Sequence, residues 1–114
     1  MNDAMNAVKI SLGEATPIDL DFTNLDVDIL LALGFNEDIN VTYMDDLAIF
    51  HSGFDLNFLA TTMVMQGGVN DTVYGNAVII GVADNDEATA LNQGQIDAVM
   101  SLVADAKEAI AMMA

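Results

Sequence analysis

Cysteine, tryptophan and arginine are absent from this chain, and its 114 residues include one proline and one histidine. Without cysteine, neither a disulfide framework nor a thiolate metal site can form, and secretion gains no support. One histidine and scattered serines offer no pattern for a nucleophile and base. We therefore expect the protein not to be an enzyme, and we expect His51 to be a partly exposed residue at a strand end.

Positive charge is nearly absent. The chain has two basic residues, Lys9 and Lys107, and 18 acidic residues, which gives a formal net charge of −16. Nucleic acids are bound by lysine and arginine side chains that neutralise phosphates, so this composition argues against direct nucleic-acid binding and against anionic membranes. A basic protein partner, a multivalent cation, or a high-salt cytoplasm in which acidity maintains solubility remain as explanations.

Long hydrophobic runs are also missing. Residues 56–70 carry no charge, but this stretch is short for a membrane span and polar residues and glycines interrupt it. Residues 1–11 lack the continuous apolar run of a secretory signal. The sequence therefore predicts a soluble, cytoplasmic protein.

What the chain does contain is core material: 54% of its residues are hydrophobic, and its length suits one domain, residues 1–114. Alternation of apolar residues predicts strands, and the apolar segment 73–82 predicts a central strand buried on both faces. Helical spacing of apolar residues predicts helices. The predicted strands are residues 8–12, 18–22, 39–43, 47–51 and 73–82, and the predicted helices are 25–33, 57–65 and about 92–112.

This order predicts an α+β fold, with a small mixed or antiparallel sheet of about five strands, two short helices and a long C-terminal helix packed on it. One apolar seam, from Ile96 to Met113, follows the 3,4 spacing of a packed helix. Met100, Leu102 and Met112 lie off this seam. These three residues predict a second contact, and a homodimer through the C-terminal helix is one form of it.

Acidic clusters and glycines are the remaining candidates for sites. Asp84, Asp86 and Glu87 are weak candidates for a metal site, but the ligand spacing of an EF-hand is missing and a solvated turn explains them better. Asp45 and Asp46 fit a hairpin turn. The glycines match no phosphate-binding motif, so we expect no cofactor.

Several phrases of the chain resemble a family of small domains of unknown function, found mostly in bacteriophages, plasmids and their hosts. They are Asn57-Phe58-Leu59-Ala60-Thr61, Tyr74-Gly75-Asn76-Ala77-Val78-Ile79-Ile80-Gly81, Leu91-Asn92-Gln93-Gly94-Gln95-Ile96 and the hairpin phrase at 39–50. The similarity runs from about Val8 to Leu102. It implies an accessory gene of a mobile element, which acts in the cytoplasm of the host, a class rich in inhibitors of host machinery and defence.

Charge and resemblance together predict an accessory binding protein that inhibits a basic host protein that handles nucleic acid or serves in defence, by mimicking nucleic acid with carboxylates. The predicted partner-binding residues are Asp19, Asp21, Asp26, Asp28, Asp45 and Asp46, together with Met100, Leu102 and Met112. The alternatives are a small-molecule binder for a nucleotide signal, and a salt-adapted interaction domain without mimicry. Like-charge repulsion further predicts that salt and mild acidification stabilise the fold.

Overall fold

One antiparallel sheet organises the computed structural model, which describes residues 5–34 and 38–113. The strands follow the order β2-β1-β5-β4-β3, and a short β6 pairs with β5. The strands are β1 (Ala7–Ile10), β2 (Ala15–Ile18), β3 (Asn40–Met44), β4 (Leu47–Leu56), β5 (Tyr74–Val82) and β6 (Ala88–Thr89). The helices are a 3-10 turn η1 (Phe22–Asn24), α1 (Leu25–Leu33), α2 (Phe58–Gln66) and α3 (Gln93–Met113). The predicted α+β class is confirmed.

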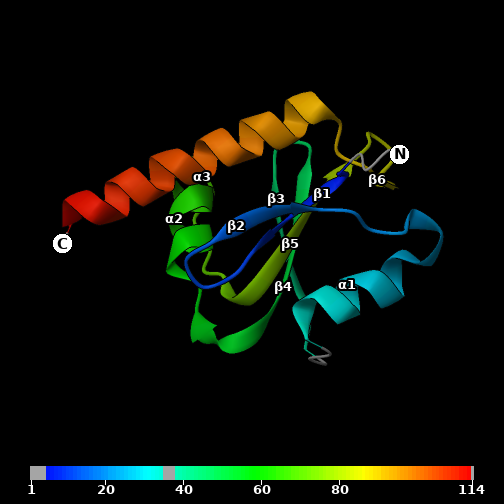
Figure 1. Cartoon of the computed structure of the whole chain (residues 1–114), viewed down its shortest axis with the longest axis horizontal. Coiled ribbons are helices and arrows are strands. Elements are labelled where there is room, and N and C mark those ends of the chain that lie inside the picture. Colours follow the sequence, from blue (N-terminus) through cyan, green and yellow to red (C-terminus); the bar gives the residue numbers. More distant parts are fainter. Residues whose placement is uncertain (1–4, 35–37, 114) are drawn as a thin grey trace.

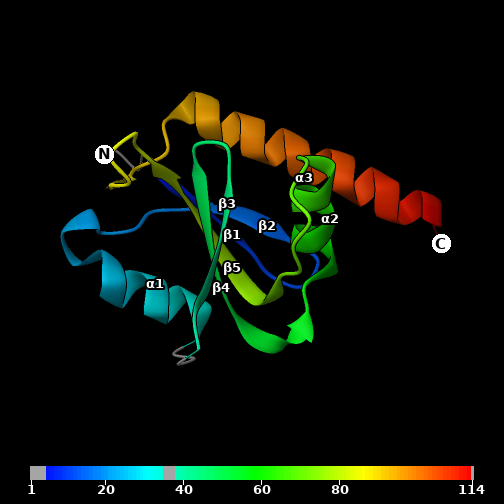
Figure 2. The ribbon, with the colours of Figure 1, turned by 180° about the vertical axis from the view of Figure 1, so that it is seen from behind.

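The predicted central strand is β5, which lies between β1 and β4. Val78, Ile79 and Ile80 at its middle are fully buried, because helices cover both faces of the sheet. Figures 1 and 2 show α1 on one side of the sheet and the pair α2 and α3 on the other. The domain is therefore a three-layer α/β/α arrangement with two apolar clusters.

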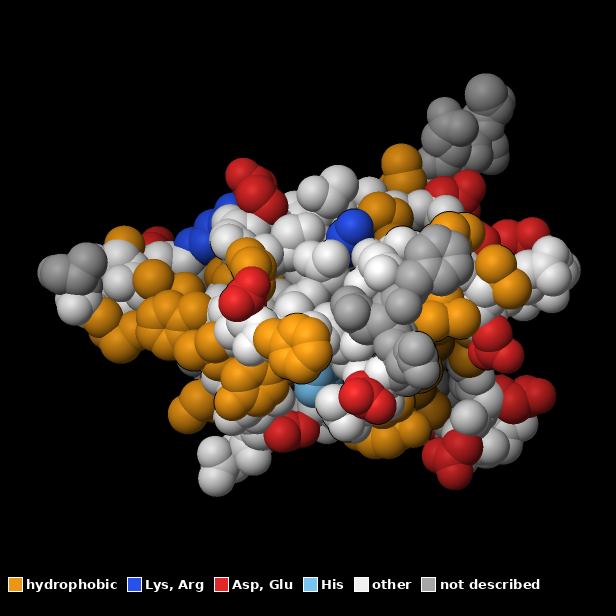
Figure 3. All heavy atoms as spheres, turned by 90° about the horizontal axis from the view of Figure 1, so that it is seen from below, with side chains coloured by type: hydrophobic (Ala, Val, Ile, Leu, Met, Phe, Trp, Pro, Cys, Tyr) orange, Lys and Arg blue, Asp and Glu red, His pale blue; other side chains and the backbone are white. Residues whose placement is uncertain are grey.

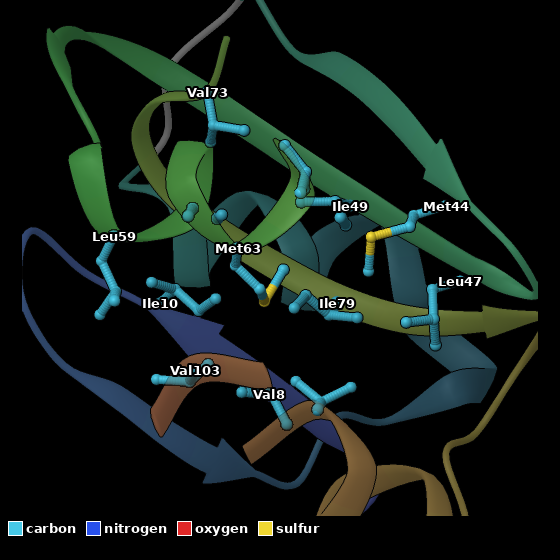
Figure 4. Packing of buried hydrophobic residues seen from close by; sticks show 14 of the residues in the cluster. Val8, Ile10, Met44, Leu47, Ile49, Leu59, Met63, Val73, Ile79 and Val103 are labelled. Carbon is cyan, nitrogen blue, oxygen red and sulfur yellow. The ribbon is translucent and has the colours of Figure 1, made fainter. Parts of the chain in front are cut away.

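The larger cluster lies between the sheet and the pair of helices α2 and α3. Figure 4 shows Ile10, Ile49 and Ile79 from three neighbouring strands, facing Met63 of α2 and Val103 of α3. The smaller cluster joins α1, through Ile29 and Leu33, to the opposite face of the sheet. Gly34 ends α1 in a left-handed conformation, with φ 86°.

The C-terminal helix follows its prediction closely. Asn92 and Gln95 form reciprocal side-chain to backbone hydrogen bonds of 2.8 and 3.0 Å at its start, which is a capping box. The seam is buried from Ile96 to Ala106. Met100 and Leu102, predicted to remain for a second contact, instead pack partly buried against the main core.

One local prediction is wrong, and one predicted strand buries its polar rather than its apolar face. The second strand was predicted to include Leu20 and Phe22, but β2 ends at Ile18 and Phe22 begins η1, because Asp21 caps that turn by accepting from the Thr23 amide. In the edge strand β3 the inward residues are Thr42 and Met44, which are buried, whereas the apolar Val41 and Tyr43 are exposed. Val41 and Tyr43 lie on the face of β3 that the smaller cluster does not reach, so their side chains are exposed to solvent.

Candidate functional site

Strand order brings the acidic pairs together. Antiparallel pairing of Ala7 with Ile18, and of Leu47 with Gly81, places the end of β2, the β3–β4 turn and the end of β5 at one end of the sheet. The helix α1 also starts there, since Asp26 and Ala88 of β6 line one shallow hollow. We call this region the acidic end; its residues are Asp19, Asp21, Asp26, Asp28, Asp45, Asp46, Asp84, Asp86, Glu87 and Asp97.

Hydrogen bonds orient several carboxylates of the acidic end. The side-chain amide of Asn6 donates to Asp19 at 3.0 Å, and the backbone carbonyl of Asn6 accepts from the amide of Leu91. These two bonds tie the end of β2 to the segment after β6. Asp28 accepts from the backbone amide of Asp21 at 2.8 Å. The hydroxyl and amide of Thr23 both donate to Asp21, and these bonds lower the pKa of that carboxyl below its usual value.

The predicted turn at Asp45 and Asp46 is confirmed. Met44 pairs with Leu47 across it, and Asp45 adopts a left-handed backbone, with φ 55°. Asp46 accepts twice: its carbonyl from the Val82 amide at 2.8 Å, and its carboxylate from Gln95 Nε2 at 3.2 Å. The turn is therefore fixed against both the end of β5 and the start of α3.

The turn between β5 and β6 holds the weak metal candidates. The Ala83 amide donates to the carbonyl of Glu87, and the Glu87 carboxylate accepts from Asn85 at 3.0 Å. Within residues 5–34 and 38–113, no group of three or more His, Asp or Glu side chains is arranged to hold a metal ion. Asp84, Asp86 and Glu87 are thus exposed turn residues of the acidic end.

His51 is buried, contrary to its prediction as a partly exposed strand-end residue, with 3% of its surface exposed. It lies within β4, which continues to Leu56, on the face that carries Leu47 and Ile49. Its Nε2 is 3.0 Å from the hydroxyl of Thr42, and that hydroxyl donates to Asp71 at 2.6 Å. Burial lowers the pKa of His51, which the nearby Asp71 partly opposes.

This His51–Thr42–Asp71 chain does not have the order of a catalytic triad. In a triad the imidazole accepts the proton of a hydroxyl that attacks substrate. Here the hydroxyl is buried and its single proton goes to Asp71, so Thr42 accepts from His51. The arrangement is structural rather than nucleophilic. The signal for it in the sequence was the shared alternation of Leu47, Ile49 and His51.

The opposite end of the sheet is apolar. A groove of about 520 Å³ lies between the β1–β2 turn, the end of β4, the start of α2 and the last turns of α3. Phe58 is 47% exposed there, and Phe54 is 96% exposed. In Figure 3 hydrophobic side chains gather toward the C-terminal end of α3, and several acidic side chains lie on the opposite side. The groove is lined by Leu12, Gly13, Leu56, Phe58, Leu59, Lys107, Ile110 and Ala111.

Of the predicted binding residues, the six aspartates at positions 19–46 all belong to the acidic end, and Met112, 83% exposed, lies at the apolar end. The meeting of Leu12, Leu56 and Phe58 could not be predicted from the sequence, since these residues come from separate elements.

Comparisons with protein families, with curated proteins and with solved structures find no match to this chain. Among the described residues, no helix combines the length and apolar character that a membrane crossing requires. Function is therefore inferred from the geometry and charge of the chain itself.

Proposed function

We propose that this chain is a phage-type accessory binding protein whose acidic end occupies the nucleic-acid-binding surface of a basic host protein and inhibits it. The supporting observation is the convergence of four acidic pairs, separated along the chain, at one end of the sheet. The pairs are Asp19 and Asp21, Asp26 and Asp28, Asp45 and Asp46, and Asp84 and Asp86.

Charge at this end is of one sign. Lys9 lies within β1, and Lys107 lies near the far end of α3. A surface that binds nucleic acid attracts closely spaced phosphates through lysine and arginine, and exposed carboxylates held close together present a similar field. Such a field speeds association and makes it steeply sensitive to salt.

Preorganisation favours this role over a diffuse acidic surface. Hydrogen bonds from Asn6, Thr23, Gln95 and Asn85 already hold acidic side chains in place before any partner arrives. Ordered side chains lose less conformational entropy on binding than free ones do. A partner with a rigid basic groove is therefore the kind best matched to the acidic end.

The test uses the immobilised chain and lysate of a bacterial host, at about 0.05 M and about 0.5 M sodium chloride, followed by elution with double-stranded DNA. We expect basic nucleic-acid-binding proteins to be retained at low salt only and to be displaced by DNA. A variant with Asp26, Asp45, Asp84 and Asp86 changed to asparagine should lose them.

The matched control removes the same number of charges elsewhere, through Glu14→Gln, Asp55→Asn, Asp105→Asn and Glu108→Gln. This control should retain the partner. Equal loss from both variants would show that net charge alone drives the binding, as in a salt-adapted surface, and retention that DNA does not displace would rule out mimicry.

A further inference from the structure

The apolar end carries exposed hydrophobic side chains from every element that reaches it. Leu12 is 56% exposed in the β1–β2 turn, Leu56 is 49% exposed at the end of β4, and Met112 is 83% exposed on α3. Leu12, Leu56 and Phe58 line the groove, and the exposed Phe54 lies with Leu12 in a neighbouring hollow. Contiguous apolar surface of this kind marks a site of interaction rather than chance exposure.

The shape of this end is self-complementary. Figures 1 and 2 show the last turns of α3 projecting past α2 and past the sheet. These turns carry the exposed Met112 and Met113, while Ile110 and Ala111 beside them line the groove. A projection and a hollow therefore lie side by side on one surface, as an isologous contact about a two-fold axis requires. Methionine side chains adapt readily to such a contact.

The charges agree with the shape. Lys107 lines the groove and, within the described part of the chain, no carboxylate pairs with it. Asp105 and Glu108 flank it on the exposed surface of α3. A two-fold contact between α3 helices would offer Lys107 of each copy an acidic partner, Asp105 or Glu108, on the other.

Repulsion between the negative charges of two copies favours contact through their apolar ends. Each copy carries a formal net charge of −16, so most approaches of two copies are unfavourable. The longest dimension of the domain is 42 Å, whereas the Debye length is about 10 Å at 0.1 M salt. Contact through the apolar ends keeps the two acidic ends on opposite sides of the pair, where salt screens each from the other.

We propose that the apolar end is a homodimer interface, in which the last turns of α3 of each copy lie against the groove of the other. A contact limited to this end is smaller than a standard stable interface, which predicts a weak dimer that depends on concentration. Added salt should strengthen this dimer, because it screens the repulsion between the copies.

Sedimentation equilibrium from about 1 µM to about 1 mM protein tests this interface. We expect a reversible monomer–dimer equilibrium for the unaltered chain, and we expect Leu12→Glu and Met112→Glu each to raise the dissociation constant at least tenfold. Leu31→Glu is the matched control, since Leu31 is 53% exposed on α1, away from the groove. It should leave the equilibrium unchanged.

Circular dichroism of every variant checks that the fold is preserved, and Met112→Glu alters a residue that lies outside the core. A chain that stays monomeric over the whole range would overturn the proposal. So would a dimer that Leu31→Glu weakens as much as Leu12→Glu does. Neither outcome bears on partner binding at the acidic end, which the aspartate variants test separately.

Discussion

The hydroxyl of Thr42 donates to the carboxylate of Asp71 at 2.6 Å, and this bond fixes the protonation of a third residue. A hydroxyl has one proton to donate, so Thr42 must accept from Nε2–H of His51. The proton of the neutral imidazole is therefore on Nε2. Its Nδ1 is buried and has no hydrogen-bond partner among the described residues.

Acid should destabilise the fold through His51. Burial lowers its folded pKa below the usual 6.5, so the unfolded chain binds this proton first. The contribution of neutral His51 to the free energy of unfolding is fully present above about pH 6.5 and is lost as the pH falls through the folded pKa. The free energy of unfolding then changes by at most about 1.4 kcal/mol per pH unit, since one proton is involved. Urea unfolding at several pH values between about 8 and about 5.5 measures this slope.

His51→Phe is the control for this pH dependence, because it keeps an aromatic ring at this buried position, removes the titration and retains the bond between Thr42 and Asp71. Its stability should not fall as the pH is lowered over the same range, because only the relief of like-charge repulsion remains. Nitrogen NMR of the imidazole should show the Nε2–H tautomer. A slope that persists in His51→Phe, or the Nδ1–H tautomer, would contradict the assignment.

Asp71 and Asp21 also make the fold less stable as the pH falls, but over a lower pH range than His51. Hydrogen bonds from Thr42 to Asp71, and from Thr23 to Asp21, lower both pKa values below 3.8. Their contribution is present above about pH 3.8 and is lost as the pH falls through the folded values. The predicted stabilisation by mild acidification therefore does not come from Asp21 or Asp71, because hydrogen bonds from local donors lower their pKa values.

Asn57 should be among the most sensitive positions for stability. It is fully buried, accepts from the Ala60 amide at 3.0 Å, and donates to the carbonyls of Ile10 at 3.0 Å and Gly75 at 2.7 Å. Asn57→Ala leaves all three groups without this partner, and we expect a loss of about 3–5 kcal/mol in the free energy of unfolding.

The control for Asn57 is Asn24→Ala. Asn24 also precedes a helix, but its side chain makes no capping bond. Chemical denaturation should show a change below about 0.5 kcal/mol for this variant. Comparable losses in the two variants would mean that the polar junction at Asn57 has no special role.

Gly75 is closely packed against the bulged part of β4. Its φ is 75°, and a Cβ atom there would collide with the backbone carbonyl of Ser52. Gly75→Ala should therefore cost about 2–5 kcal/mol, from strain and overpacking together. Gly68→Ala has a similar φ, 91°, but open space around it, and should cost only about 1–2 kcal/mol. Thermal unfolding that ranks Gly68→Ala as the more harmful would refute this account.

Sodium chloride should raise the melting temperature. Eighteen carboxylates and two lysines leave strong repulsion in the folded state, and screening shortens from about 10 Å at 0.1 M to about 3 Å at 1 M salt. The four-charge variant of the acidic end should melt higher and respond less to salt. A melting temperature that salt lowers would contradict this view, and a shift specific to calcium would indicate a cation at Asp84 and Asp86.

Much of the fold was predictable because its elements are locally encoded. The apolar seam of α3 and the largely apolar β5 can be recognised without knowledge of their neighbours. The inward face of β3 was not predictable in this way. Val41 and Tyr43 alternate as buried residues do, but which face is covered depends on how far the smaller cluster extends.

The candidate sites depended more on topology. The aspartates were recognisable as pairs, but their convergence requires the strand order, which places β5 between β1 and β4. The burial of His51 depends equally on its long-range neighbours, since Asp71 reaches Thr42 from the segment after α2. The alternation of Leu47, Ile49 and His51 could indicate the inward face of β4, but the long-range bond from Thr42 to Asp71 and the convergence of the aspartates could not be predicted from composition or periodicity.

The position of β5 also sets the order in which the chain can fold. The hairpin of β1 and β2 and the hairpin of β3 and β4 do not pair with each other; each meets the sheet through β5. During synthesis, the edges of β1 and β4 that pair with β5 therefore stay unpaired until residues 74–82 have left the ribosome. Closing such distant pairings is slow compared with forming local ones. The acidic turns would help to keep these waiting intermediates apart, through charge repulsion between nascent chains.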